Sequence, residues 1–215
     1  MTENLIEAQY DVTKKNRLRR FYEKNKILFF SISFIFIFAL SFFSIYLEKQ
    51  EKKKILLSEN YIQAKVYLEN GKKNEALELL KKVVFANDST YSTLCFFLIM
   101  NQNLITDHKE LTVLFDHLLK KNKFSNEQKN LLIYKKALLN SDFVNEEEML
   151  KTLKPLLNNE TFWTPHALIL LGDYFTSKKE HIKAIEFYKK IFTINNLHED
   201  FYKYARSQLT IITNE

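Results

Sequence analysis

The chain has 215 residues, of which 46% are hydrophobic and 27% charged, and its formal net charge is +6. It contains only two glycines, two prolines and one cysteine, which excludes an intrachain disulfide and disfavours a sheet with many tight turns. So few glycines also leave no phosphate-binding loop and no dinucleotide-binding motif. Apolar residues recur at three- and four-residue spacing, and this spacing predicts an all-α protein.

The strongest single feature is the segment 27–47, which holds 21 consecutive residues without a charge, seven of them phenylalanine. As a helix it would be about 31 Å long, which matches the hydrocarbon core of a bilayer. A buried soluble helix would show a polar stripe, and this segment has only scattered serines. A cleaved signal peptide would have a shorter apolar core, and further apolar residues follow the possible cleavage site at Ala39-Leu40-Ser41. We therefore predict a transmembrane helix at 27–47.

Basic residues on the two flanks of this span predict its orientation. Seven lie shortly before it, whereas the far flank offers four, at positions 49 and 52–54. Basic flanks resist translocation, so residues 1–26 should form a basic cytoplasmic segment against membrane lipid, with residues 48–215 on the other side. Nucleic-acid binding is the rival explanation of the positive charge, but the sequence shows no basic face with exposed aromatics and no nucleic-acid-binding module. The seven basic residues that precede the span are Lys14, Lys15, Arg17, Arg19, Arg20, Lys24 and Lys26.

Helix start and stop signals divide the rest of the chain. Thr164 followed by Pro165 suits a helix start, Gly71 suits a helix stop, and Pro155 should kink or shorten the helix that contains it. Four further pairs of residues have the spacing of a capping box. These pairs are Asp107/Glu110, Ser125/Gln128, Asn145/Glu148 and Ser177/Glu180. The predicted helices lie near 55–69, 74–86, 91–103, 108–122, 126–140, 146–157, 165–177, 180–194 and 199–212.

The helices are predicted to form pairs, because two segments, 57–88 and 165–196, carry the residue spacing of a tetratricopeptide repeat. Small residues at Gly172 and Ala184 would let two helices approach closely, and Tyr188 would fill the gap to the next pair. We therefore predict a tetratricopeptide-like helical-pair solenoid over 48–215. The pairs at 91–122 and 126–158 match it only in helix length and apolar spacing. The repeat positions are Ala64, Tyr67, Gly71, Ala76, Leu80 and Val83 in the first segment and Leu171, Gly172, Phe175, Ala184, Tyr188 and Ile191 in the second.

The first helix of each pair in such a solenoid lines a concave surface that can bind partners. The register of the two clearest pairs places six residues there, and these are the predicted protein-binding residues. Trp163, just before the second repeat segment, is expected to pack onto that repeat rather than to meet a partner. The six residues are Tyr61, Lys65 and Leu68 from one pair and Ile169, Asp173 and Thr176 from the other.

Residue patterns typical of enzymes are missing from the sequence. The five histidines include no pair at i, i+4 spacing, and neither a zinc-protease motif nor a nucleophile elbow occurs. Cys95, flanked by Leu94 and Phe96, is predicted to be a core residue. We therefore expect no catalytic, cofactor or metal site and no small-molecule substrate. An enzyme with dispersed active-site residues is the rival in a different class.

A short basic N-terminus, one span and a degenerate repeat domain occur here together with Tyr10, Lys24-Asn25-Lys26, the stretch from Tyr61 through Gly71 to Ala76-Leu77, Tyr91, Gly172-Asp173-Tyr174, Ala184 and Tyr188. In this combination the chain resembles the ancillary SecYEG translocon subunit family of bacterial inner membranes. The resemblance implies a periplasmic repeat domain and a link between the Sec translocon, exported proteins and periplasmic chaperones. An envelope-assembly or cell-division adaptor with the same fold is the alternative, as is a cytoplasmic scaffold if the topology is reversed.

Overall fold

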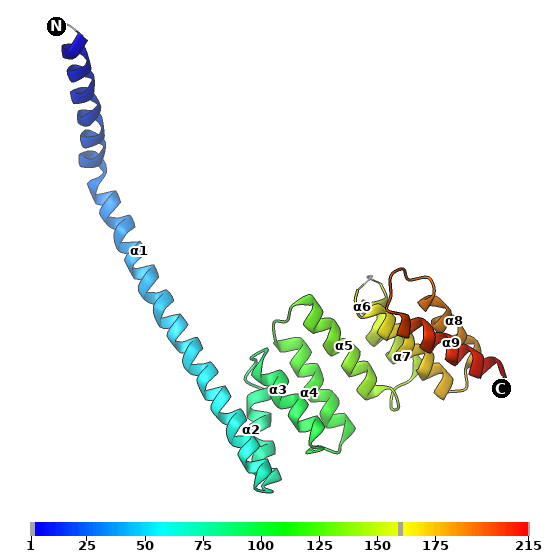
Figure 1. Cartoon of the computed structure of the whole chain (residues 1–215). Helices are drawn as coiled ribbons and strands as arrows, with labels where there is room; N and C mark the ends of the chain where they lie inside the picture. Colours follow the sequence, from blue (N-terminus) through cyan, green and yellow to red (C-terminus); the bar gives the residue numbers. More distant parts are fainter. Residues whose placement is uncertain (1–2, 159–160, 215) are drawn as a thin grey trace. The chain divides into compact units, whose positions relative to one another are not determined.

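The computed structural model describes residues 3–158 and 161–214, with side chains for Arg19 and from residue 21 onward. Within this part every regular element is an α-helix, and nine helices follow one another along the chain (Figure 1). Contacts divide the chain into two compact units, Met1–Leu56 and Leu57–Glu215, and α1 extends through both. The helices are α1 (Glu3–Glu69), α2 (Lys73–Val84), α3 (Tyr91–Asn101), α4 (His108–Lys121), α5 (Asn126–Asn140), α6 (Glu146–Leu157), α7 (Thr164–Ser177), α8 (His181–Ile191) and α9 (Glu199–Asn214).

Helix α1 corrects one prediction. A span at 27–47 and a separate helix near 55–69 were expected, but α1 is continuous from Glu3 to Glu69. Residues 48–54 contain only Glu, Lys and Gln, which favour helix, and Lys52 pairs with Glu48 one turn earlier. The apolar and the charged segments therefore share one helix. In the predicted basic segment, the structure describes only the backbone of Tyr10, Lys14, Lys15, Arg17 and Arg20, and their side chains lie outside the described part of the chain.

The apolar part of α1 is solvent-exposed along its length. Every large apolar side chain between Ile27 and Leu47 is exposed. Phe34, Phe38 and Phe42 follow one another along the helix, with ring centroids 5.5 Å and 6.2 Å apart. The helix is long and apolar enough to cross a membrane. These properties suit a membrane anchor or a signal sequence, because exposed phenylalanines are unfavourable in water.

Gly71 ends α1, as predicted. Its φ of 72° lies in the left-handed region that glycine adopts without steric cost. The backbone N–H of Lys72 donates to the carbonyl of Tyr67 at 2.8 Å, and that of Gly71 donates to Leu68 at 3.0 Å. These two bonds form a Schellman motif, which satisfies carbonyls at the helix end. The chain then turns directly into α2.

The helices from α2 onward pack in sequence, each against the next, which confirms the predicted all-α helical-pair architecture. Their apolar residues form two clusters. One cluster joins the end of α1, for example Leu57 and Ala64, to the helices α2–α5. The other joins α5–α9 around Phe175 and Tyr188, which are fully buried. Apart from the one at 55–69, the predicted helix ranges lie within three residues of the observed bounds.

The repeat positions behave as predicted at the contact between α7 and α8. A Cβ added at Gly172 would lie 2.6 Å from Cζ of Tyr188, so no larger residue fits there without displacement. Ala184 and Tyr188 are fully buried. In the earlier repeat segment, Ala64 and Ala76 are likewise fully buried. Small residues therefore mark the close approaches between helices.

One of the predicted capping boxes is complete, and a second is represented by its N-cap hydrogen bond. Ser125 forms a complete capping box with Gln128 at the start of α5. At α6 the Asn145 side chain accepts a hydrogen bond from the backbone N–H of Glu148 at 3.0 Å. Three glutamates in the first turn, at 146–148, complement the helix dipole.

The other predicted caps differ. Asp107 caps α4 through the N–H of Lys109, while Glu110 pairs with Lys81 of α2 instead of completing a box. Ser177 is not an N-cap, because α7 ends there in a Schellman motif with Lys179 at a φ of 61°.

The two predictions that involve proline were only partly correct. Helix α7 begins at Thr164 itself, one residue earlier than predicted, and Pro165 lies in its first turn. Helix α6 keeps its predicted range and continues for two residues beyond Pro155 instead of ending before it. Because proline has no backbone N–H, α6 continues past Pro155 with one intrahelical hydrogen bond fewer, the one to the carbonyl of Lys151.

Candidate functional site

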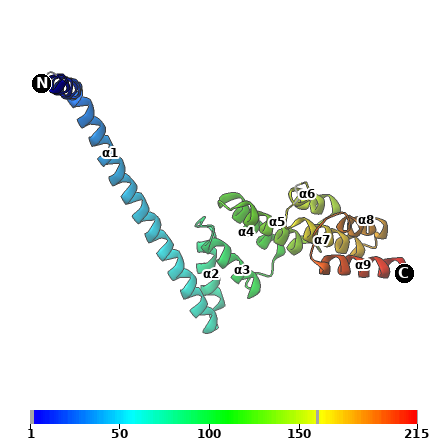
Figure 2. The same cartoon turned by 45° about the horizontal axis from the view of Figure 1, so that its top comes forward.

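Helix α7 carries four half-buried residues on one face, at positions i, i+3, i+7 and i+10. In both views α7 lies between α5 and the pair α8–α9, and it contacts α5, α8 and α9 (Figures 1 and 2). This spacing puts the four side chains on one side of the helix. They are His166, Ile169, Asp173 and Thr176.

An aromatic group covers the first turn of α7. Trp163 stacks on Tyr134 of α5 with ring centroids 5.6 Å apart and lies 5.0 Å from His166. His166 also meets Phe201 of α9 edge-on at 4.9 Å, and Phe162 lies 5.5 Å from Trp163. Trp163 packs against the second core cluster, as predicted. Because the rings come from three separate parts of the sequence, tertiary packing holds this surface together.

Asp173 lies two turns further along α7 and is held by two phenols. The hydroxyl of Tyr188 donates to Asp173 Oδ1 at 2.6 Å, and the hydroxyl of Tyr204 on α9 donates to the same oxygen at 3.0 Å. Thr176 is also bound locally, since its hydroxyl donates to the carbonyl of Gly172 at 2.8 Å. The carboxylate therefore has a fixed orientation. We call Tyr134, Trp163, His166, Ile169, Asp173 and Tyr204 together the α7 face.

The environment keeps the titratable groups of this face uncharged near neutral pH, apart from the carboxylate. Burial, with the nearby Asp173 charge, raises the pKa of Tyr204 to about 12. Burial and the hydrogen bond to Asp173 raise the pKa of Tyr188, and burial raises the pKa of Tyr134. Burial also lowers the pKa of His166, partly offset by the Phe162 backbone, so its imidazole stays neutral at pH 7.

The six predicted protein-binding residues lie in two separate places. Ile169, Asp173 and Thr176 share one side of α7, as the register predicted. Tyr61 and Leu68 of α1 are half-buried against the first core cluster, and Lys65 is exposed. The residues on α7 lie beside the second core cluster and those on α1 beside the first. The role of all six residues in binding stays a prediction.

Sequence reasoning missed Tyr134, His166 and Tyr204. His166 could have been found, because it lies three residues before Ile169 in the same register. Tyr134 and Tyr204 come from helices without the repeat signature, so no positional signal in the sequence marked them.

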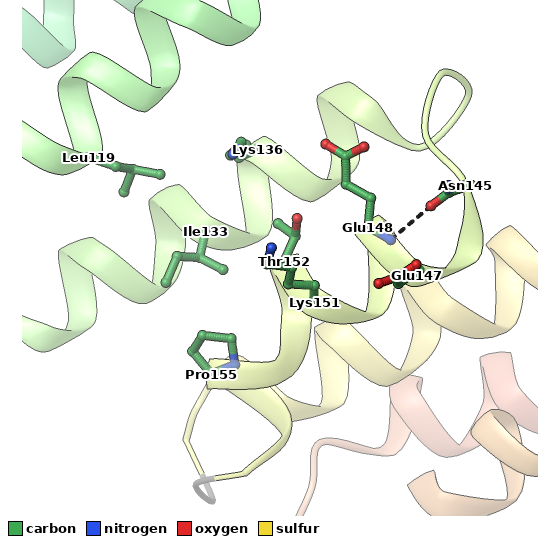
Figure 3. A pocket seen from close by; sticks show the side chains of 9 residues that line it. All are labelled: Leu119, Ile133, Lys136, Asn145, Glu147, Glu148, Lys151, Thr152 and Pro155. Atoms are coloured by element: carbon green, nitrogen blue, oxygen red, sulfur yellow. Dashed lines mark hydrogen bonds between the residues drawn. The ribbon is translucent and has the colours of Figure 1, made fainter.

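A pocket of about 560 Å³ lies elsewhere in the domain, among α4, α5 and α6 (Figure 3). Its lining includes no histidine, and the carboxylates of Glu147 and Glu148 are exposed. Asn145 is used to cap α6, and Lys136 pairs with Asp116. The lining residues therefore offer no buried acid–base pair. They are Leu119, Ile133, Lys136, Asn145, Glu147, Glu148, Lys151, Thr152 and Pro155.

Two further features of the domain could in principle carry chemistry. Cys95 is fully buried in the first core cluster, as predicted, and burial raises the pKa of its thiol to about 12. Within the described residues, no group of three or more histidine, cysteine or carboxylate side chains is placed to hold a metal ion. The α7 face is therefore the strongest candidate site in the described part of the chain.

Comparisons with protein-family models, with curated proteins and with solved structures find no significant match to this chain.

Proposed function

We propose that this protein is a membrane-anchored, non-enzymatic scaffold whose helical-pair domain binds other proteins through the α7 face. The observation that carries the proposal is an exposed apolar helix, long enough to span a bilayer, on the same chain as the packed aromatic rings of the α7 face. Tyrosine and tryptophan are enriched among the residues that dominate protein–protein binding energy. Half-buried aromatic rings held by their neighbours lose little entropy when a partner covers them.

Tethering is the mechanism of this proposal. An anchor confines the domain to the membrane surface and raises its effective concentration toward partners held there. Modest affinity at the α7 face is then sufficient for function. Such a scaffold requires no cofactor, metal or small-molecule substrate.

The more specific form of the proposal is an ancillary subunit of the Sec translocon, with its N-terminus in the cytoplasm and its domain in the periplasm. Exported proteins and periplasmic chaperones would then be the partners. The resemblance to that family and the seven-to-four excess of basic residues before the span support it. An envelope-assembly or cell-division adaptor would have the same fold and differ only in its partner.

Site-specific photo-cross-linking in intact cells tests the proposal. A photoreactive phenylalanine derivative replaces Tyr204 on the α7 face, or Ile182 on α8, which is 78% exposed, as the control. We expect position 204 to cross-link to translocon subunits or periplasmic chaperones and position 182 not to do so. Cross-links to envelope-assembly or division proteins would favour the adaptor. Equal cross-linking at both positions, or none at 204, would refute binding through the α7 face.

A further inference from the structure

Asp173 differs from the other acidic residues that hold tertiary contacts in the domain. Asp116 pairs with Lys136, Glu110 with Lys81, and Glu146 with Lys183. Asp173 takes part in none of the ion pairs among the described residues, although the chain has 32 lysines and arginines. Its described partners are the neutral phenols of Tyr188 and Tyr204. The α7 face therefore presents a negative charge that no cation of the described chain neutralises by direct contact.

The two phenols orient this carboxylate without neutralising it. Both donate to Oδ1, and no described residue donates to Oδ2. Because their pKa values are raised, Tyr188 and Tyr204 remain neutral donors across the physiological range. His166 lies on the same side of α7, but its lowered pKa keeps it from serving as a counter-ion. A half-buried carboxylate in this setting favours an approaching cation, because its field is poorly screened there.

The aromatic rings lie at a distance that one short peptide can bridge. His166 and Asp173 are seven residues apart on α7, which corresponds to about 10 Å along the helix. An extended chain advances about 3.3 Å per residue, so three or four residues of a partner would reach from Asp173 to the level of His166, whose ring lies 5.0 Å from that of Trp163. The faces of Trp163 and Tyr134 attract both cationic and apolar side chains.

We propose that the α7 face binds a segment of a partner protein that carries a lysine or arginine, with its cationic head against Asp173 and its neighbouring side chains on Trp163 and Tyr134. This inference rests on the proposed function, because it names the chemistry of the partner at the same face. It specifies a basic segment, whereas the proposed function requires only that some protein binds there.

The test uses the full-length protein in detergent and four pools of octapeptides. Each pool is random except for one central position, fixed as arginine, lysine, glutamine or glutamate. Wild type is compared with Asp173→Asn, which removes the charge but keeps an oxygen that can accept from both tyrosines. Asp142→Asn, an exposed position between α5 and α6, is the matched control. Circular dichroism and Trp163 fluorescence verify that each variant is folded.

We expect wild type and Asp142→Asn to bind the arginine and lysine pools about tenfold more tightly than the glutamine pool. In Asp173→Asn this preference should disappear. The net charge of +6 disfavours non-specific binding of basic peptides, so a preference for them is informative. Equal binding of all four pools, no binding of any pool, or a preference unchanged in Asp173→Asn would overturn the inference. The cross-linking at position 204 stays independent of this result, so the two proposals can fail separately.

Discussion

Gly172 on α7 lies directly against the phenol ring of Tyr188 on α8. A Cβ at position 172 would come within 2.8 Å of three ring atoms, and the ring is fully buried. Tyr188 also donates to Asp173, the next residue along α7, at 2.6 Å. The close approach of the two helices and the orientation of the carboxylate on the α7 face therefore depend on the same tyrosine.

The first prediction concerns this contact. Gly172→Ala should destabilise the domain by up to about 2 kcal/mol, because an overpacking cost of about 1–3 kcal/mol is offset by a gain of about 1 kcal/mol in helix propensity. Urea unfolding of the full chain in detergent, followed by the fluorescence of Trp163, measures the change. In a Tyr188→Leu background the same substitution should instead stabilise the domain by up to about 1 kcal/mol, since the ring is gone and only the gain in helix propensity remains. An equal cost in both backgrounds would contradict the contact.

The second prediction compares two serines that each lie three residues before a glutamine or glutamate, the spacing of a capping box. Ser125→Ala should cost about 1 kcal/mol, because it removes the capping box of α5. Ser177→Ala should change stability by less than about 0.5 kcal/mol, because Ser177 is the last residue of α7 and its hydroxyl bonds only to the Tyr174 carbonyl. Thermal unfolding followed by circular dichroism measures both. Equal costs would mean that Ser177 also caps a helix.

The third prediction concerns alkaline pH. The tyrosines around Asp173 have raised pKa values in the folded protein, to about 12 for Tyr204, against about 10 in an unfolded chain. Above pH 10 the unfolded chain therefore binds fewer protons than the folded one, so the free energy of unfolding should fall as pH rises from 10 to 12. Urea unfolding at a series of pH values measures this slope, and Tyr204→Phe should reduce it. A stability that stays constant over this range would contradict the prediction.

The fourth prediction concerns the thiol of Cys95. Because the side chain is fully buried and its pKa is raised to about 12, a thiol reagent at pH 8 should label the folded protein very slowly. Urea should make labelling rapid. Asp142→Cys, at an exposed position, provides the control that reacts at once. Fast labelling of Cys95 without denaturant would place the thiol outside the core.

Much of the fold could be predicted from local signals. The exposed apolar segment 27–47, the glycine at the end of α1 and the small residues at Gly172 and Ala184 each act through the backbone or through close packing, which sequence spacing reveals. The predicted break in the helix between residues 47 and 55 was wrong. The charged residues there mark the change from an apolar to a polar environment, but they do not end a helix. Ser177 was misassigned because Lys179 adopts the left-handed conformation that usually signals glycine.

Only part of the candidate site was accessible from the sequence. The side of α7 with Ile169 and Asp173 follows from repeat register. The tyrosines that complete it come from α5 and α9, whose sequences carry no repeat signature. Which phenol reaches Asp173 depends on how α8 and α9 pack, and that packing is a tertiary property. The charge of Asp173 was visible in the sequence, but the absence of an ion pair for it among the described residues was not.

The most direct measurement is the membrane topology of the chain. Alkaline phosphatase, which is active only outside the cytoplasm, is fused after Glu215, and a reporter active only in the cytoplasm is fused at the same place in a parallel strain. We expect phosphatase activity, no activity of the cytoplasmic reporter, and a full-length fusion that stays in the membrane after alkaline extraction. An inactive phosphatase with an active cytoplasmic reporter would put the α7 face in the cytoplasm and contradict the translocon proposal. A shortened, soluble fusion would show that residues 27–47 are a cleaved signal rather than an anchor.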